Sequence, residues 1–230
     1  AYFHTGNGKS TGKGLATHTD GDLKYYGAGL YGKYVYNKFS LLGDVSYNKI
    51  TDDVDSDLGL LSYTKASANI DTHMVKAGLV GQYNFDVKSV SVIPHAGVRY
   101  TTMYSENYGI KANGNYIAKI KNDRLSLVSV PVGVTVEKTF ALGFDWKVKP
   151  ALDLGLTFNS GDTDATYKTT FIGVKPASLK AEIVDKVVYN VGAGLKFSHK
   201  KNADIETGVA YSCSDNTNDV SFYLTGSYQF

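Results

Sequence analysis

Long segments of this sequence alternate between apolar and polar residues with a period of two. In the last eleven residues the apolar positions are Val220, Phe222, Leu224, Gly226, Tyr228 and Phe230, and polar side chains fill the positions between them. Successive side chains of a β-strand point to opposite faces, so this alternation predicts a strand with one apolar and one polar face. Eight further segments show the same pattern: 26–36, 39–48, 75–85, 90–104, 128–137, 146–159, 187–198 and 204–212.

The length of these predicted strands separates two kinds of all-β protein. Most of the nine segments span about 10–15 residues, whereas strands of soluble proteins average about 5–6 residues. A tilted strand needs about 9–11 residues to cross a bilayer. Aromatic residues also lie near the segment ends, where a membrane barrel carries its girdles: Tyr34, Tyr36, Phe39, Tyr83, Phe85, Tyr104, Trp146, Phe158, Phe197, Tyr211, Tyr228 and Phe230. The sequence therefore favours a transmembrane β-barrel over a soluble sandwich.

Composition agrees with this interpretation and excludes other classes. The mean hydropathy of −0.20 resembles that of a soluble domain, but two opposite faces cancel in the average of a barrel. No apolar run is long enough for a transmembrane helix, and the single Cys213 precludes an internal disulfide. A net charge of +2 gives no electrostatic case for nucleic-acid binding.

The connections between predicted strands sort into two kinds that alternate along the chain. Short ones are expected at 37–38, 86–89, 139–144 and 199–202, and long polar ones at 50–71, 105–125 and 160–186, with 213–219 intermediate. Outer-membrane barrels have short periplasmic turns and long outer loops. This sorting predicts a periplasmic C-terminus, an outer loop at 6–23 and the end of another strand at 1–5. Such barrels close with an even strand number, so at least one strand is expected before Ala1.

Charged residues recur on the polar faces of the predicted strands, where they would line the lumen. The predicted lumen-lining residues are Lys33, Asp44, Lys76, Arg99, Glu137, Lys147, Lys149, Asp153, Lys196 and Glu206. A mixed-charge lumen suits a hydrophilic conduit, and it equally suits charges that pair across strands to satisfy one another. Glycines on the same faces either leave room for a polypeptide or serve strand curvature.

Four stretches of the sequence, taken in order, carry a resemblance to a known family. They are Tyr26–Gly32 (YGAGLYG), Pro94–Tyr100 (PHAGVRY), the strand from Pro150 that runs into Ser160-Gly161-Asp162, and Val191–Leu195 (VGAGL). Together they resemble the C-terminal translocator domain of autotransporters, the type V secretion family. The resemblance covers essentially the whole chain and implies a single domain, residues 1–230, with an all-β, antiparallel, up-and-down barrel fold. The family barrel has twelve strands, and about ten of them would fall within this chain, without the first two strands and the pore helix.

The resemblance also implies a function. The chain would be an outer-membrane translocator and anchor of a Gram-negative-type bacterium, enabling export of a covalently linked upstream passenger. Its expected partners are membrane lipid and the barrel-assembly machinery, with no cofactor and no enzymatic activity. Phe222, Leu224, Tyr228 and Phe230 would form the C-terminal assembly signal, although the usual glycine of that signal falls at Thr225 here. A general porin or small-solute channel is the alternative.

The sequence contains no specific catalytic or metal-binding motif. Gly6–Thr11 (GNGKST) resembles a phosphate-binding loop, but Phe3 occupies the position of its first glycine and no strand–loop–helix context follows. No GxSxG motif occurs, and the five histidines are scattered. We therefore predict no catalytic residue and no metal site. The resemblance implies that some family members cleave themselves with the help of acidic residues inside the barrel, but none of the lumen-facing acids of this chain can be matched to that role.

Overall fold

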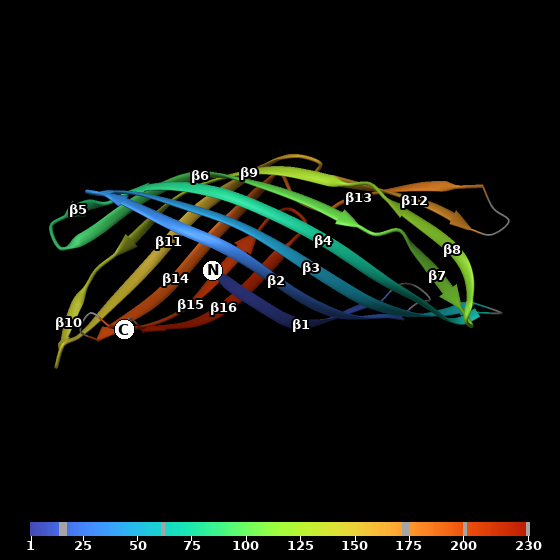
Figure 1. Ribbon diagram of the computed structural model, residues 1–230, viewed down its shortest axis with the longest axis horizontal. Coiled ribbons are helices and arrows are strands. Elements are labelled where there is room, and N and C mark those ends of the chain that lie inside the picture. The colour runs from blue at the N-terminus through green and yellow to red at the C-terminus, as the bar shows by residue number, and fades with distance from the viewer. Residues whose placement is uncertain (14–17, 61–62, 172–174, 200–201, 229–230) are drawn as a thin grey trace.

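The computed structural model describes residues 1–13, 18–60, 63–171, 175–199 and 202–228. These residues form strands and turns, and none of them builds a helix long and apolar enough to cross a membrane. Ten long strands make one curved antiparallel sheet (Figure 1). They are β1 (Tyr2–Lys13), β2 (His18–Tyr36), β3 (Phe39–Leu60), β4 (Tyr63–Tyr83), β6 (Val90–Ser105), β9 (Leu125–Glu137), β11 (Trp146–Gly161), β14 (Val187–His199), β15 (Ala203–Cys213) and β16 (Asn218–Tyr228).

Each long strand pairs with the next long strand along the chain, which is an up-and-down meander. This order confirms the predicted all-β, antiparallel, up-and-down fold. Over the described residues, β1 pairs only with β2 and β16 only with β15. The sheet is therefore an open barrel wall whose two edges are β1 and β16. The opening between these two edges is called here the seam.

Six short strands extend the two ends of this wall. β5 (Phe85–Val87) and β10 (Phe140–Gly143) lie at the end of the wall that carries the short turns, where they pair with β6 and β11. The other end carries the hairpins β7 (Tyr108–Ala112) with β8 (Asn115–Asn122), and β12 (Asp164–Phe171) with β13 (Ala177–Glu182) (Figure 1). β7 pairs with β4 and β12 pairs with β8, so β7, β8, β12 and β13 form one continuous outer sheet.

The predicted outer loops were wrong, because strands occupy most of their length. β3 and β4 continue through 50–71, the outer sheet fills much of 105–125 and 160–186, and β1 and β2 cover 6–13 and 18–23. Both faces of these extensions carry polar residues, so their sequence shows no apolar–polar alternation. The short turn at 37–38 is confirmed: it joins β2 to β3, with Asn37 at a φ of 53°. The predicted turns 86–89 and 139–144 contain parts of the short strands β5 and β10, and residues 200–201 of the predicted turn 199–202 lie outside the described residues.

Side-chain exposure in the ten-stranded sheet is the reverse of that in a soluble protein. Leu152 and Leu154 of β11 and Val191 of β14 are 46%, 47% and 43% exposed, whereas Asp153 and Asn190, which alternate with them along the same strands, are half-buried. Within the described ranges no large side chain is fully buried. The buried apolar residues are small or lie in the outer sheet and the adjoining part of β4: Ala66, Ala112, Ala118, Ile120 and Ala165. A water-soluble chain of this size would bury an apolar core, so the exposed face requires a non-aqueous partner.

Aromatic side chains lie on the exposed apolar face, at the end of the wall that carries the short turns. Tyr36 of β2, Phe39 of β3 and Tyr83 of β4 stand directly opposite one another. The Tyr83 ring contacts Phe85, with 4.6 Å between ring centroids. Toward the other end of the wall, Phe158 of β11 is exposed on the same apolar face. These positions agree with the predicted aromatic girdles at two membrane interfaces.

Candidate functional site

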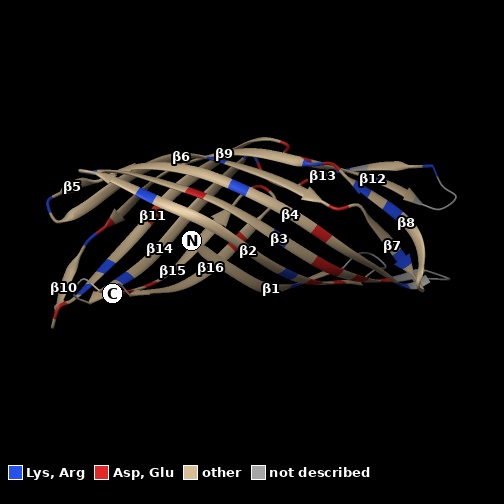
Figure 2. Cartoon of the chain, in the orientation of Figure 1, with Lys and Arg blue, Asp and Glu red and all other residues tan. Residues whose placement is uncertain are grey.

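The ten predicted lumen residues lie on one face of the sheet, opposite the exposed apolar residues. Asp44 of β3 and Arg99 of β6 both stand opposite Gly78 of the intervening β4. Lys149, Lys196 and Glu206 form a similar row across β11, β14 and β15, and Figure 2 shows charged positions along these strands. The two-residue strand period and the strand register place the remaining predicted residues on the same face: Lys33, Lys76, Glu137, Lys147 and Asp153.

Side chains on this polar face meet across strands that are not direct neighbours. Arg99 Nη2 lies 3.7 Å from Asp44 Oδ1, and the two residues meet above Gly78. His95 similarly lies above Gly133, where an added Cβ would be 2.6 Å from His95 Nε2. Such convergence of second-neighbour strands occurs on the concave side of a curved sheet. The glycines therefore serve close cross-strand contacts, and the polar face is the inner face of the wall.

Most charges on the polar face of β9, β11, β14 and β15 are paired. Lys149 Nζ donates to Glu137 Oε1 at 3.0 Å, and Lys196 Nζ lies 3.0 Å from an Asp204 oxygen. The hydroxyl of Thr135 donates to Asp153 Oδ2 at 2.6 Å. Both Glu137 and Asp153 are partly shielded from solvent. Cross-strand pairing of this kind offsets part of the cost of holding the charges away from bulk water.

Five of the predicted residues meet in a single groove of about 380 Å³ on this wall. The groove, called here the polar groove, is lined by Glu137, Lys149, Asp153, Lys196, Glu206 and Tyr223, with small residues between them. Tyr223 reaches it from β16, where its hydroxyl donates to Glu206 Oε1 at 3.2 Å. Its ring lies above Gly194 and Gly208. The polar groove therefore presents carboxylates, ammonium groups and one phenol side by side.

The other predicted residues are more scattered. Lys33, Lys76 and Lys147 lie on the polar face without an ion-pair partner among the residues that the structure describes. The predicted assembly-signal residues of β16 lie on the opposite, apolar face, where Phe222 is 80% and Leu224 is 76% exposed. Tyr228 is 60% exposed on that face, and Phe230 lies outside the described residues.

Sequence reasoning placed His95, Thr135 and Tyr223 on the polar face but did not select them as site residues. His95 Nδ1 lies 3.9 Å from Asp153 Oδ2, the same oxygen that accepts the hydrogen bond from the Thr135 hydroxyl. A histidine and a hydroxyl that both face one carboxylate do not form a relay from nucleophile to base. Strand parity predicted the face of each residue, but no sequence pattern predicted their contacts.

The outer end of the wall is held together by Asp185, in the connection between β13 and β14. Asn216, in the connection between β15 and β16, donates its backbone N–H and its side-chain amide to this carboxylate, at 3.1 and 2.6 Å. Hydrogen bonds from Ser214 and Asn216 hold the pKa of Asp185 below its ordinary value. The side chain of Asn159 donates to the backbone carbonyl of Asp185 at 2.7 Å. Asp185 thus ties together three outer parts of the sheet, through its carboxylate to Asn216 and through its backbone carbonyl to Asn159.

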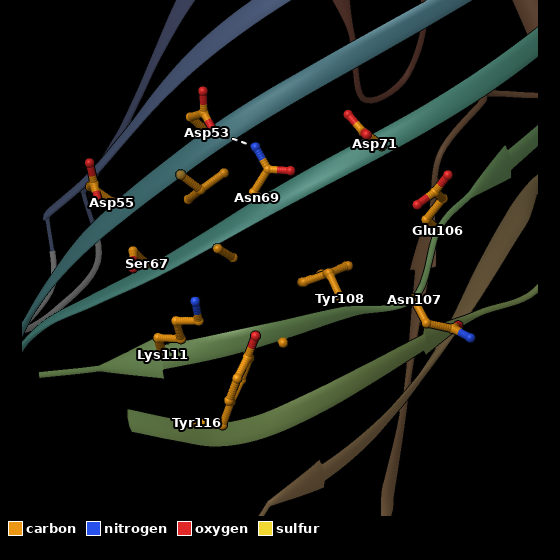
Figure 3. A pocket seen from close by; sticks show the side chains of 13 residues that line it. Asp53, Asp55, Ser67, Asn69, Asp71, Glu106, Asn107, Tyr108, Lys111 and Tyr116 are labelled. Atoms are coloured by element: carbon orange, nitrogen blue, oxygen red, sulfur yellow. Dashed lines mark hydrogen bonds between the residues drawn. The ribbon is translucent and has the colours of Figure 1, made fainter. Parts of the chain in front are cut away.

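A second, larger pocket of about 510 Å³ lies outside the polar face. It is formed between the outer parts of β3 and β4 and the β7–β8 hairpin (Figure 3). Asp53, Asp55, Asp71 and Glu106 line it on the side of β3, β4 and the connection to β7. Asn69 Nδ2 donates to Asp53 Oδ1 across β3 and β4. Over the described ranges, no group of three His, Cys, Asp or Glu side chains is arranged to hold a metal ion.

Comparison with known families assigns this fold. The family model described as "Autotransporter beta-domain" matches residues 2–228. The chain belongs to the autotransporter β-domain family. No curated protein sequence matches it. Among solved structures, the β-domain of the Bordetella autotransporter BrkA is 15% identical, with a TM-score of 0.68 over 98% of this chain and 89% of that one.

A second autotransporter structure shows the same fold. The translocator domain of NalP from Neisseria meningitidis is 13% identical and has a TM-score of 0.64, covering 99% of this chain and 74% of that one. The predicted resemblance is thereby confirmed. The autotransporter β-domain is an outer-membrane translocator barrel of Gram-negative bacteria, serves export of the passenger domain linked upstream of it, and belongs to a family of translocators rather than enzymes. The alternative of a general porin is not favoured.

Two glycines of this β-domain offer a matched test of the close contacts between its strands. A Cβ at Gly97 of β6 would lie 2.5 Å from the backbone oxygen of Leu79 and 3.0 Å from Val80 Cα, whereas a Cβ at Gly32 of β2 would meet nothing within 4 Å. Overpacking of this kind costs about 1–3 kcal/mol. We expect Gly97→Ala to lower the thermal unfolding midpoint of the detergent-folded domain, and Gly32→Ala to leave it near the wild-type value. Equal midpoints for the two variants would contradict the observed strand packing.

Proposed function

We propose that the concave polar face forms the wall of a water-filled conduit, through which a segment of the passenger crosses the outer membrane. The single observation that carries this proposal is the reversed exposure of the sheet. Apolar side chains such as Leu154 and Val191 are exposed on the convex face, and paired charges such as Glu137 and Lys149 are shielded on the concave face. The convex face then contacts hydrocarbon.

A hydrated wall suits a passing polypeptide for a physical reason. Backbone N–H and C=O groups that enter hydrocarbon without partners cost several kcal/mol each, so an extended chain cannot cross through lipid. The polar groove offers both donors and acceptors, from Lys149 and Lys196 as well as Glu137 and Asp153. Lys149 pairs with Glu137, and Lys196 and Asp153 have partners in Asp204 and Thr135, so the wall remains satisfied before and after the chain passes.

The seam between β1 and β16 supports a proposal about the rest of the barrel. Each of these strands has one hydrogen-bonded neighbour in the described part of the chain. A strand edge open to lipid leaves backbone groups unsatisfied, which membrane barrels avoid by closing. We propose that strands of the same protein outside residues 1–230 pair with β1 and β16 and close the barrel.

The two ends of the wall support a proposed orientation. The end with the short turns and the C-terminal end of β16 faces the periplasm, and the outer sheet faces the outside, since outer-membrane barrels carry short turns on the periplasmic side. The convex face contacts membrane lipid. Phe222, Leu224, Tyr228 and Phe230 form the alternating apolar signal that the barrel-assembly machinery binds in this proposal. No catalytic role is assigned to the domain.

The proposed function is tested by export in intact cells. The full-length protein is expressed, protease is added outside, and the passenger and the β-domain are followed with separate antibodies. We expect the passenger to be digested and the sheet to be protected, and we expect a protein without the β-domain to keep its passenger inside. A passenger that reaches the surface without this domain would contradict the proposal. So would a domain that passes small solutes but leaves its passenger in the periplasm.

A further inference from the structure

One face of the outer sheet carries lysines in regular alternation with buried residues. Lys119 and Lys121 of β8 are exposed. Ile120, which lies between them, is only 5% exposed, and Ala118, which precedes Lys119, is only 2% exposed. Lys168 of β12 is exposed in the same way. The three lysines are called here the lysine face. Because the opposite side of the outer sheet is packed, the lysine side chains are held on the solvent side.

The lysine face points to the same side of the sheet as the membrane-facing apolar residues. On β4, Ser67 and the exposed Val75 share one face by the two-residue period. Ser67 stands directly opposite Lys111 of β7, and Gly109, two residues before Lys111, stands opposite Lys119. The lysine face therefore lies on the convex side of the wall. Its strands lie beyond the ends of β6 and β9 and beside the outer part of β4 (Figure 1).

The charge on the lysine face is only partly compensated. Lys121 stands directly opposite Lys168, and like charges at directly opposite positions destabilise a pair of strands. Asp123 lies 3.7 Å from Lys168, but neither Lys119 nor Lys121 has a carboxylate within ion-pair distance over the described ranges. The carboxylates of the pocket in Figure 3 lie on the same side of the sheet, on β3, β4 and the β6–β7 connection, but none of them forms an ion pair with the three lysines. An external anion would relieve this repulsion.

We propose that the lysine face binds the phosphate groups of anionic glycolipids in the outer surface of the membrane beside the barrel. The proposal rests on the proposed function, because it requires the barrel to stand in that membrane with the outer sheet outside. Lysine ammonium groups bind phosphate as point charges, and each lysine near an anionic membrane surface strengthens association roughly fivefold. The face lies on the convex side, where surrounding lipid is in reach, and not over the lumen.

The test uses hydrogen–deuterium exchange of the protein inserted into nanodiscs. One set of nanodiscs contains phosphatidylcholine alone, the second adds phosphorylated lipopolysaccharide, and a third sample contains phosphatidylcholine with free inorganic phosphate. We expect amides of residues 108–122 and 164–171 to exchange more slowly with lipopolysaccharide, by at least roughly fivefold, which is the contribution of one lysine. The variant K119Q/K121Q should lose this protection. The control K88Q/K138Q removes two lysines from the opposite end and should retain it.

Each outcome of this experiment decides the proposal. Exchange that is equal in all three samples, or protection that survives in K119Q/K121Q, overturns it, and equal protection by free phosphate would show an anion site without a lipid preference and overturns it too. Insertion is monitored separately through the amides of β9 and β11. A protein that inserts but shows no lipid response refutes only the lysine face, whereas a protein that fails to insert refutes the proposed function as well.

Discussion

Leu154→Arg is expected to abolish assembly of this β-domain in the outer membrane. Leu154 lies within β11 on the convex face, 47% exposed, and stands opposite Val134 of β9 and Val191 of β14. All three side chains would contact hydrocarbon. Arginine on the lipid face of a barrel costs about 2–4 kcal/mol near the bilayer midplane. A loss of that size is a large share of the stability of most proteins, so the folded fraction should fall sharply.

The matched control is Ala151→Arg, three residues earlier on the same strand. Ala151 lies on the concave face, directly opposite Glu137, so the new guanidinium would meet water and a carboxylate. Assembly is measured as the fraction of β-domain in the outer-membrane pellet that keeps its heat-modifiable gel mobility. We expect this fraction to stay near the wild-type value in Ala151→Arg and to collapse in Leu154→Arg. A larger loss in Ala151→Arg would mean that the two faces have been exchanged.

The long strands could be predicted from sequence because lipid and lumen impose opposite demands on alternate residues. Leu152 and Leu154 face out while Ala151 and Asp153 face in, and the register of β11 with its neighbours keeps this division. The same physics predicted the faces of the charged residues. Strand parity therefore determined orientation wherever one side of the sheet contacts hydrocarbon.

The outer sheet could not be predicted for the converse reason. In the outer part of β3, Asp53 and Asp55 stand opposite Asp22 and Asp20 of β2, and polar residues such as Asp52 occupy the other side of the strand as well. No apolar face exists there to produce an alternation, so the sequence resembles a loop. Strand pairing in this region follows from continuation of the hydrogen-bond ladder that begins in the membrane.

The contacts within the candidate site also lay beyond sequence reasoning. Tyr223 reaches Glu206 because Gly208 and Gly194 leave space under its ring. His95 approaches Asp153 in the same way, over Gly133. Such contacts depend on the curvature and stagger of the sheet, which no local pattern encodes. The chemical character of the wall could be predicted from the sequence, but the contacts between its side chains are evident only from the structure.

Thiol labelling along β11 tests the central claim most directly. Cys213 is replaced by serine, and single cysteines are placed at four successive positions, Ala151, Leu152, Asp153 and Leu154, which alternate between the two faces. The protein is inserted into nanodiscs and treated with a charged, water-soluble maleimide. We predict rapid labelling at 151 and 153, where the wall is wet, and almost none at 152 and 154, where lipid covers it. Labelling at 152 and 154 that equals or exceeds that at 151 and 153 would contradict the account.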